Sequence, residues 1–123
     1  MSHDIVSDCL NMIMNAKKAR KNQLEVNRYS KFLIKVLDIA KKSRYLDYNI
    51  EENKLSIKIK ELNECRAIKP RFNATLDEIE KYMRRFLPAR NFGIVIISTS
   101  KGLMTHKEAY DKNIGGSLIA YFY

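Results

Sequence analysis

The chain has 123 residues, of which 46% are hydrophobic, and it contains 7 tyrosines and 5 phenylalanines. This is enough for one compact unit or two very small ones packed together, and too little for a large enzyme. The 23 lysines and arginines outnumber the 14 acidic residues, which gives a formal charge of +9. A charge balance of this sign predicts a polyanionic partner, either a nucleic acid or an anionic membrane surface.

The hydropathy pattern and the cysteines indicate which classes of protein and site can be excluded. No apolar run approaches the roughly 20 residues that span a bilayer, and no segment resembles a signal peptide. Cys9 and Cys65 lie far apart, without a CxxC motif or a histidine cluster, so neither a disulfide framework nor a zinc site is predicted. We expect a cytoplasmic protein with buried thiols, and without a metal site, a cofactor or a place in the membrane.

The N-terminal segments predict a helix, a strand and a second helix. Residues 4–16 carry apolar side chains at helical spacing, and residues 17–21 add four positive charges at the end of this helix. These cations are explained equally well by the helix dipole or by a polyanion contact. A short strand around Leu24 and Val26 follows, and Ser30 is placed to cap a second helix.

A hairpin is predicted next. Residues 54–60 alternate strictly between apolar and polar side chains, which is typical of a half-buried strand. Residues 48–50 form its predicted partner, and residues 51–53 form the turn, although they lack the glycine that favours tight primed turns. The first half is therefore predicted to be α-β-α-β-β.

The regular strand pattern of the first half is interrupted at Pro70 and Arg71, because proline disfavours a regular strand ladder. We place a domain boundary here, so that residues 1–66 form an N-terminal α/β domain and residues 67–123 a C-terminal, mainly β domain. In the second domain Thr75 and Glu78 form a capping box, which predicts a short helix that ends at Pro88.

The rest of the second domain is predicted to alternate strand, helix and strand. The apolar run Phe92 to Ile97 predicts a buried strand. Thr105 with Glu108 forms a second capping box, and Gly115-Gly116 is expected to end the brief helix. Residues 117–123 have strand composition. The predicted fold class is α+β, with two small packed domains.

The segment Ser98-Thr99-Ser100-Lys101-Gly102 joins three hydroxyls, one cation and one glycine. Hydroxyls suit the 2′-hydroxyls and base edges in the wide minor groove of an RNA helix, and lysine suits a phosphate. Gly102 allows close backbone approach or a positive φ. By composition alone, a plain polar loop between strand and helix is the better explanation.

Longer motifs add to this interpretation. STSKGLMTHKEA (98–109), the NIGGSLIAYFY ending, AIKPRF (67–72) and RFLPARNFGIVI (85–96) closely resemble the small-subunit ribosomal protein eight family, in its archaeal and, more distantly, its eukaryotic form. The first half agrees more loosely, through MIMNAKK and YSK. It departs from the family pattern at Asn27-Arg28, where lysine-proline is usual, and in the absence of glycine from residues 45–66.

The resemblance implies an architectural protein whose two domains bind ribosomal RNA of the central domain and help small-subunit assembly, as a monomer beside neighbouring ribosomal proteins. The positions that match the family's RNA contacts in the second domain are Ser98, Thr99, Ser100, Lys101, Gly102, Met104, Thr105, Gly115 and Gly116. In the first domain they are Asn15, Lys17, Ser30 and Lys31, of which the two lysines are expected to position phosphates.

Three alternatives remain. Ser100, His106 and Asp111 can be assembled into a hydrolytic triad, but no GxSxG elbow accompanies them and we expect no catalysis and no small-molecule substrate. A basic DNA-binding protein is the stronger rival, although the strand predicted between the first two helices leaves no tight helical turn for a recognition helix. The third is feedback regulation through binding of the protein's own messenger.

Overall fold

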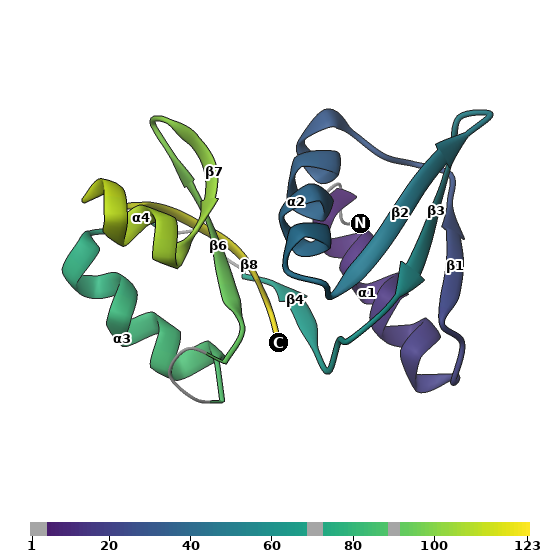
Figure 1. Ribbon diagram of the computed structural model, residues 1–123, viewed down its shortest axis with the longest axis horizontal. Coiled ribbons are helices and arrows are strands. Elements are labelled where there is room, and N and C mark those ends of the chain that lie inside the picture. The colour runs from purple at the N-terminus through teal and green to yellow at the C-terminus, as the bar shows by residue number, and fades with distance from the viewer. Residues whose placement is uncertain (1–4, 69–72, 89–91) are drawn as a thin grey trace. The chain divides into compact units, whose positions relative to one another are not determined.

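The computed structural model describes residues 5–68, 73–88 and 92–123. Helices and strands both make up large parts of the structure, which confirms the predicted α+β class (Figure 1). The chain divides into two compact units, Met1–Arg66 and Ala67–Tyr123. Pro70 and Arg71, which suggested a boundary in this part of the sequence, lie outside the described residues.

The first unit has the predicted order of helix, strand, helix, strand and strand. Its elements are α1 (Ile5–Lys18), β1 (Gln23–Val26), α2 (Lys31–Lys42), β2 (Leu46–Glu51) and β3 (Lys54–Ile59). The predicted first residue of α1, Asp4, lies outside the described residues. The strands form an antiparallel sheet in the order β1-β3-β2.

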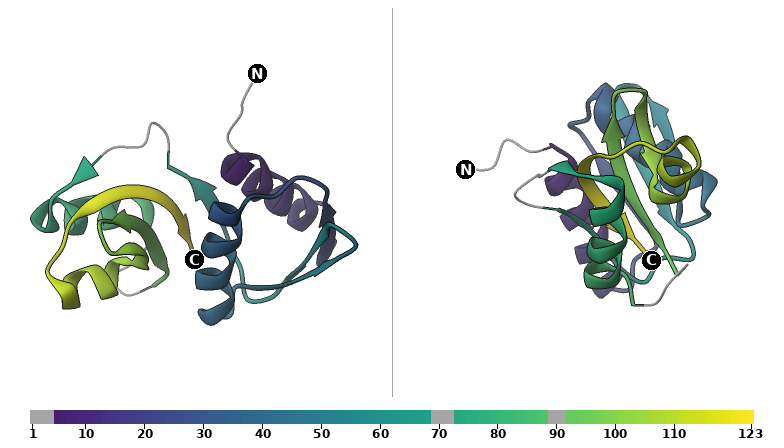
Figure 2. Two further views of the ribbon diagram at one scale, coloured as in Figure 1. Left: turned by 90° about the horizontal axis from the view of Figure 1, so that it is seen from above. Right: turned by 90° about the vertical axis from the view of Figure 1, so that its left-hand side faces the viewer.

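Alternation along the strands gives this sheet one apolar face, formed by Val26, Leu46, Leu55 and Ile57, each at most 4% exposed. Both helices lie on the same side of the sheet (Figure 2). Each presents a stripe of buried side chains at helical spacing, so the core of the unit lies between the sheet and the two helices.

Both helices of the first unit end on an arginine in the left-handed conformation. Arg20 has φ 60° and Arg44 has φ 66°. After Arg20, the Lys21 amide donates to the Ala16 carbonyl at 2.9 Å, and α2 ends in the same way. This is the Schellman arrangement, in which glycine is the usual left-handed residue because it carries no Cβ.

The β2–β3 connection is tighter than predicted. Glu51 and Lys54 are paired in the ladder, so the loop contains only Glu52 and Asn53. Their φ angles are 50° and 62°. Two positive φ angles are the signature of a type I′ turn, which therefore forms here without glycine.

The second unit contains the C-terminal strands and two helices. Its elements are β4 (Cys65–Ala67), which begins before the boundary between the units, β5 (Asn73–Ala74), α3 (Leu76–Phe86), β6 (Ile94–Thr99), β7 (Gly102–Thr105), α4 (His106–Lys112) and β8 (Gly116–Phe122). The sheet order is β4-β8-β6-β7, and β5 also pairs with β8. Helices α3 and α4 cover one face of this sheet (Figure 2).

The core of the second unit joins the covered face of the sheet to the two helices. Ile79 and Met83 of α3 and Ala109 of α4 pack with Val95 and Leu118 of the sheet in one buried cluster. Within the described ranges, no helix has the length and apolar character needed to cross a membrane.

Four features of the second unit differ from the sequence predictions. β4, β5 and β7 were not predicted, and β6 begins at Ile94 rather than Phe92 and continues to Thr99. Gly115-Gly116 does not end α4, because Asn113 takes the left-handed C-terminal position with φ 57°. The prediction that Ser98–Gly102 joins a strand to a helix is also wrong, since this segment turns from β6 into β7.

Candidate nucleic-acid interface

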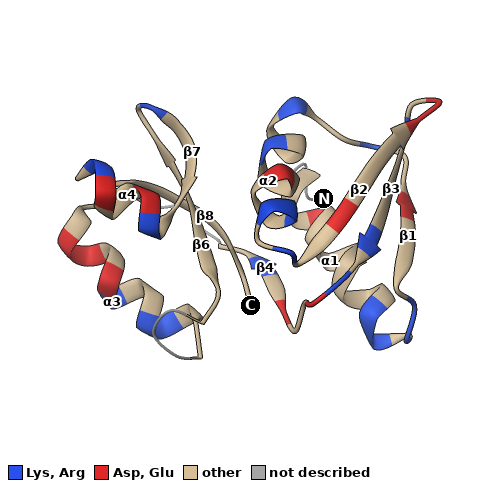
Figure 3. Cartoon of the chain, in the orientation of Figure 1, with Lys and Arg blue, Asp and Glu red and all other residues tan. Residues whose placement is uncertain are grey.

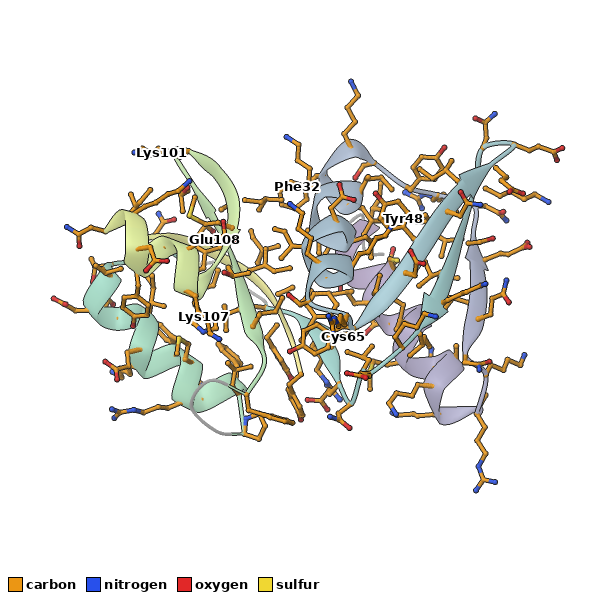
Figure 4. The ribbon with its side chains drawn as sticks, in the orientation of Figure 1. Phe32, Tyr48, Cys65, Lys101, Lys107 and Glu108 are labelled. Carbon is orange, nitrogen blue, oxygen red and sulfur yellow. The ribbon has the colours of Figure 1, made fainter. Side chains whose placement is uncertain are left out.

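The β6–β7 hairpin turns through a two-residue loop. The ladder pairs Thr99 with Gly102, so Ser100 and Lys101 form the loop, and both are exposed. The Thr99 hydroxyl donates to the Gly102 carbonyl at 2.9 Å, and the Lys101 amide donates to the same hydroxyl at 3.1 Å. Thr99 therefore fixes the turn, and Ser100 and Lys101 present their side chains to the surroundings. Figure 4 shows Lys101 at the tip of the hairpin.

Gly102 is required by its backbone angle. Its φ is 110°, and a Cβ built on it would meet no atom within 4 Å. Two explanations for Gly102 were expected, close backbone approach and a positive φ. Within the unit the positive φ accounts for it, and close packing does not.

Gly115 and Gly116 are packing residues. A Cβ on Gly115 would lie 2.4 Å from the Ala74 carbonyl oxygen, and one on Gly116 would lie 2.3 Å from the Ser98 carbonyl oxygen. Only glycine lets the start of β8 approach β5 and β6 this closely. The pair thus supports Ser98, at the base of the hairpin, from the neighbouring strand.

Cross-strand register adds two residues that the sequence analysis missed. Asn73 pairs with Ser117, Ser117 pairs with Ser98, and Ser98 pairs with Leu103. Because paired residues on neighbouring strands face the same side, the polar side chains Asn73, Ser117 and Ser98 form a row that leads to the hairpin. Sequence spacing gives no signal for this row, since strand pairing is a tertiary property.

The remaining predicted positions of the second unit have internal roles. Met104 is 2% exposed, so its side chain supports the hairpin from the core and is not available at the surface. Thr105 caps α4, because its hydroxyl accepts from the Glu108 amide at 3.3 Å. This confirms the capping interaction predicted for that pair.

In the first unit the predicted positions fall into two separate places. Asn15 and Lys17 lie in the last turns of α1. Ser30 caps α2, with its hydroxyl accepting from the Leu33 amide at 3.2 Å, and Lys31 is the first residue of that helix. Figure 3 shows the end of α1 and the start of α2 at opposite ends of the unit. The four residues therefore do not form one patch.

The positive charge is shared between the units. Residues 1–66 contain 14 lysines and arginines and 9 acidic residues, and residues 67–123 contain 9 and 5. A polyanion would therefore be attracted to either unit.

The hydrolytic triad considered from the sequence does not form. His106 is 1% exposed, and its Nδ1 accepts from the Val95 amide at 3.2 Å. Burial lowers the pKa of His106 to about 4. Ser100 is exposed at the hairpin tip and Asp111 is exposed on α4, so neither contacts the imidazole. Among the described residues, no three His, Cys, Asp or Glu side chains are grouped as metal ligands.

Comparison with known proteins identifies the family. The family model described as Ribosomal protein S8 matches residues 4–123. Small ribosomal subunit protein uS8 of Nanoarchaeum equitans is 41% identical over 129 residues, which cover 100% of both chains. Small ribosomal subunit protein uS8A of Schizosaccharomyces pombe is 36% identical over 125 residues, and uS8 of Neurospora crassa is 40% identical over 126, each covering 97% of this chain and 96% of the relative. The resemblance seen in the sequence is confirmed: the chain belongs to the ribosomal protein S8 family and is a structural constituent of the small ribosomal subunit.

Proposed function

We propose that the chain binds folded ribosomal RNA of the central domain of the small subunit directly and supports assembly of that subunit. The observation that carries the proposal is the β6–β7 tip. Ser100 and Lys101 are exposed there, while Thr99 and Gly102 hold the turn in one conformation. A contact surface that is already ordered loses little conformational entropy on binding.

Each exposed group of the hairpin has a distinct proposed role. The Ser100 hydroxyl donates to or accepts from base edges and 2′-hydroxyls in a wide RNA minor groove. Lys101 contacts a phosphate and fixes the orientation of the protein on the RNA. The row Asn73, Ser117 and Ser98 continues the same polar surface across the sheet.

The first unit contributes contacts that position the RNA. Lys17 and Lys31 neutralise phosphates, and Asn15, which is exposed on α1, donates from its side-chain amide. Ser30 is already engaged as the cap of α2, so its role is to order the turn in which Lys31 lies. The role is architectural, within cytoplasmic ribosomes beside neighbouring small-subunit proteins. It needs no catalytic group, cofactor or small-molecule substrate.

The test is a titration of the full chain with a central-domain RNA fragment of its own source, with random duplex RNA and DNA alongside. Ser100→Ala should weaken binding to the ribosomal fragment selectively. Lys101→Ala should weaken all three nucleic acids alike and reduce the salt dependence by about one phosphate contact. Lys107→Ala is the matched control, because Lys107 is an exposed lysine of the same unit that lies on α4, away from the hairpin tip (Figure 4). Equal binding of the wild type to all three nucleic acids would overturn the proposal.

A further inference from the structure

Four aromatic rings form a continuous row in the second unit, which we call the aromatic row: Phe86, Tyr121, Tyr123 and Phe92. The Phe86 and Tyr121 centroids are 5.4 Å apart with ring planes 20° from parallel. Tyr121 and Tyr123 are 6.1 Å apart at 7°, and Tyr123 and Phe92 are 6.2 Å apart at 48°. All three distances are normal for interacting aromatic rings.

The row begins in the core and ends at the surface. Tyr121 is 8% exposed, Phe86 and Tyr123 are partly buried, and Phe92 is 49% exposed. The inner rings are explained by packing against the core of the unit. Packing does not explain the outer ring, whose exposed fraction is the largest among the large hydrophobic side chains of the described residues.

The backbone holds the outer end of the row in place. Gly93 follows Phe92, and a Cβ on it would lie 2.6 Å from the Phe122 carbonyl oxygen and 2.7 Å from the Tyr123 Cβ. Its φ of 109° is also unfavourable for other residues. Glycine at this position brings Phe92 against the end of β8, where Tyr123 supports it from one side.

Cations accompany the inner end of the row. Arg84 and Arg85 lie in the last turn of α3 beside Phe86, and both are exposed. The ion pair of Arg84 with Glu80 is 3.5 Å long and exposed to solvent, so it holds the guanidinium only weakly. Supported aromatic rings beside basic side chains are what single-stranded nucleic acid requires, because bases stack on the rings and phosphates are neutralised by the cations.

The aromatic row is separate from the hairpin tip. Phe92 precedes β6 and Ser100 follows it, so the two lie at opposite ends of that strand (Figure 1). At the usual rise of a strand residue, the eight residue steps between them span about 25 Å. A duplex contacted at the tip and a base stacked on Phe92 would therefore be distinct parts of the RNA.

We propose that Phe92 is a stacking platform for an unpaired nucleobase of RNA, supported from one side by Tyr123, with Arg84 and Arg85 at the other end of the aromatic row attracting more distant phosphates of the same strand. This inference rests on the proposed RNA binding and adds a second site to it. The ligand is an unpaired nucleotide and not a duplex, because a base stacked within a helix has no free face for the phenyl ring.

The absence of tryptophan from the chain allows a direct test. Phe92→Trp places the one tryptophan of the full-length protein on the platform, and this indole can be excited selectively at the long-wavelength edge where the tyrosines do not absorb. Titration with a short oligoadenylate RNA should quench its emission, because a stacked adenine contacts the indole. The matched control is Tyr110→Trp, at another exposed aromatic position of the same unit, where no quenching is expected. Equal quenching of the two variants, or quenching of neither, would overturn the proposal.

Affinity gives the second measurement. Phe92→Leu keeps an apolar side chain but removes the aromatic face, and it should weaken oligoadenylate binding by about 5- to 100-fold, the loss of one stacked base. Phe92→Tyr should retain the wild-type affinity, and duplex RNA should bind all three proteins alike. Unchanged oligoadenylate affinity in Phe92→Leu would exclude base stacking and leave the exposed ring as a protein contact.

The two proposals can fail separately. If the wild type does not prefer the ribosomal fragment but the Phe92→Trp signal and the Phe92→Leu loss are seen, the proposed function falls and the platform remains. If Ser100→Ala lowers affinity for the fragment while Phe92 variants behave as wild type with every RNA, the platform falls and the proposed function remains.

Discussion

The two tight hairpins of the molecule, β2–β3 and β6–β7, both turn through residues with a positive φ, but they carry side chains of opposite charge at the tip. The β2–β3 tip places both positive φ angles on Glu52 and Asn53, and the β6–β7 tip places its positive φ on Gly102. The first tip is acidic and the second carries Lys101 (Figure 3). In a chain of charge +9 that attracts polyanions, the first tip repels a phosphate and the second attracts one. The β6–β7 tip is therefore the candidate RNA contact, and the β2–β3 tip an ordinary turn, because of their charges and not because of their backbone geometry.

The largest expected difference between the hairpins is their response to acid. Within the described part of the chain, the β6–β7 side alone is tied to a buried histidine, through the bond from the Val95 amide to His106 Nδ1. The pKa of His106 is lowered from 6.5 to about 4 by burial. Between these values the unfolded chain binds more protons, so stability is fully present above pH 6.5 and is lost as the pH falls toward 4.

We expect the free energy of unfolding to fall by about 2 kcal/mol from pH 7 to pH 5 from this group alone. Urea denaturation at several pH values measures it. His106→Asn, whose side-chain oxygen can accept from Val95, should show a shallower dependence. The hydrogen-exchange protection factor of the Val95 amide should fall on acidification, and the protection factors of the β2–β3 pairs should not. An equal loss of protection in both sheets would contradict the assignment to His106.

Charge reversal at the tips tests the comparison next. Lys101→Glu should weaken RNA binding by about 10-fold at moderate salt, because an attractive phosphate contact becomes repulsive. The reciprocal variant Glu52→Lys should not weaken it. Filter binding at two salt concentrations measures both effects. A loss of affinity in Glu52→Lys as large as that in Lys101→Glu would show that the β2–β3 tip also contacts RNA.

Backbone strain distinguishes the hairpins in a third way. Gly102→Ala forces an alanine into φ 110° and should cost about 1 kcal/mol of stability. Because no atom lies near the added methyl, the loss is one of conformation and not of packing. Thermal unfolding checks it, with Gly102→Asn as a control that tolerates positive φ better. If alanine and asparagine cost the same, a steric contact and not the backbone angle would be responsible.

The smallest effect is a gain. Asn53→Gly relieves a positive φ in the other hairpin and should stabilise the protein by about 0.5 kcal/mol, since the relief of strain is offset by the greater freedom of glycine in the unfolded chain. Chemical denaturation measures the change in midpoint. RNA affinity should stay the same, because Asn53 lies at the acidic tip. A lower midpoint would mean that asparagine stabilises the type I′ turn by its own side chain.

Local sequence signals predicted the helices and the first hairpin well. Ser30, Thr75 and Thr105 were placed correctly at helix starts, because a cap is a contact over three residues. β4, β5 and β7 were missed. β4 and β5 have only 3 and 2 residues, and β7 is a strand only through its pairing with β6.

The candidate site was predictable only in part. RNA contact by the Ser98–Gly102 segment was predicted from its composition and from the family resemblance. Asn73 and Ser117 could not be found, because their place beside Ser98 depends on the register of three strands. The role of the glycine pair was predicted wrongly for a related reason. Gly116 is required because the Ser98 carbonyl of another strand lies too close for a Cβ, and not because it ends the preceding helix.

The left-handed arginines at the ends of α1 and α2 carry positive charge at positions where glycine would fit the backbone better. Glycine at Arg20 and Arg44 would relieve the positive φ and stabilise the fold by about 0.5 kcal/mol at each site, after the greater freedom of glycine in the unfolded chain is counted. The same exchange would remove a cation from the end of each helix. Efforts to make this protein more heat-resistant by that route would therefore erode its attraction for polyanions, and variants selected for stability alone should drift toward a less basic surface.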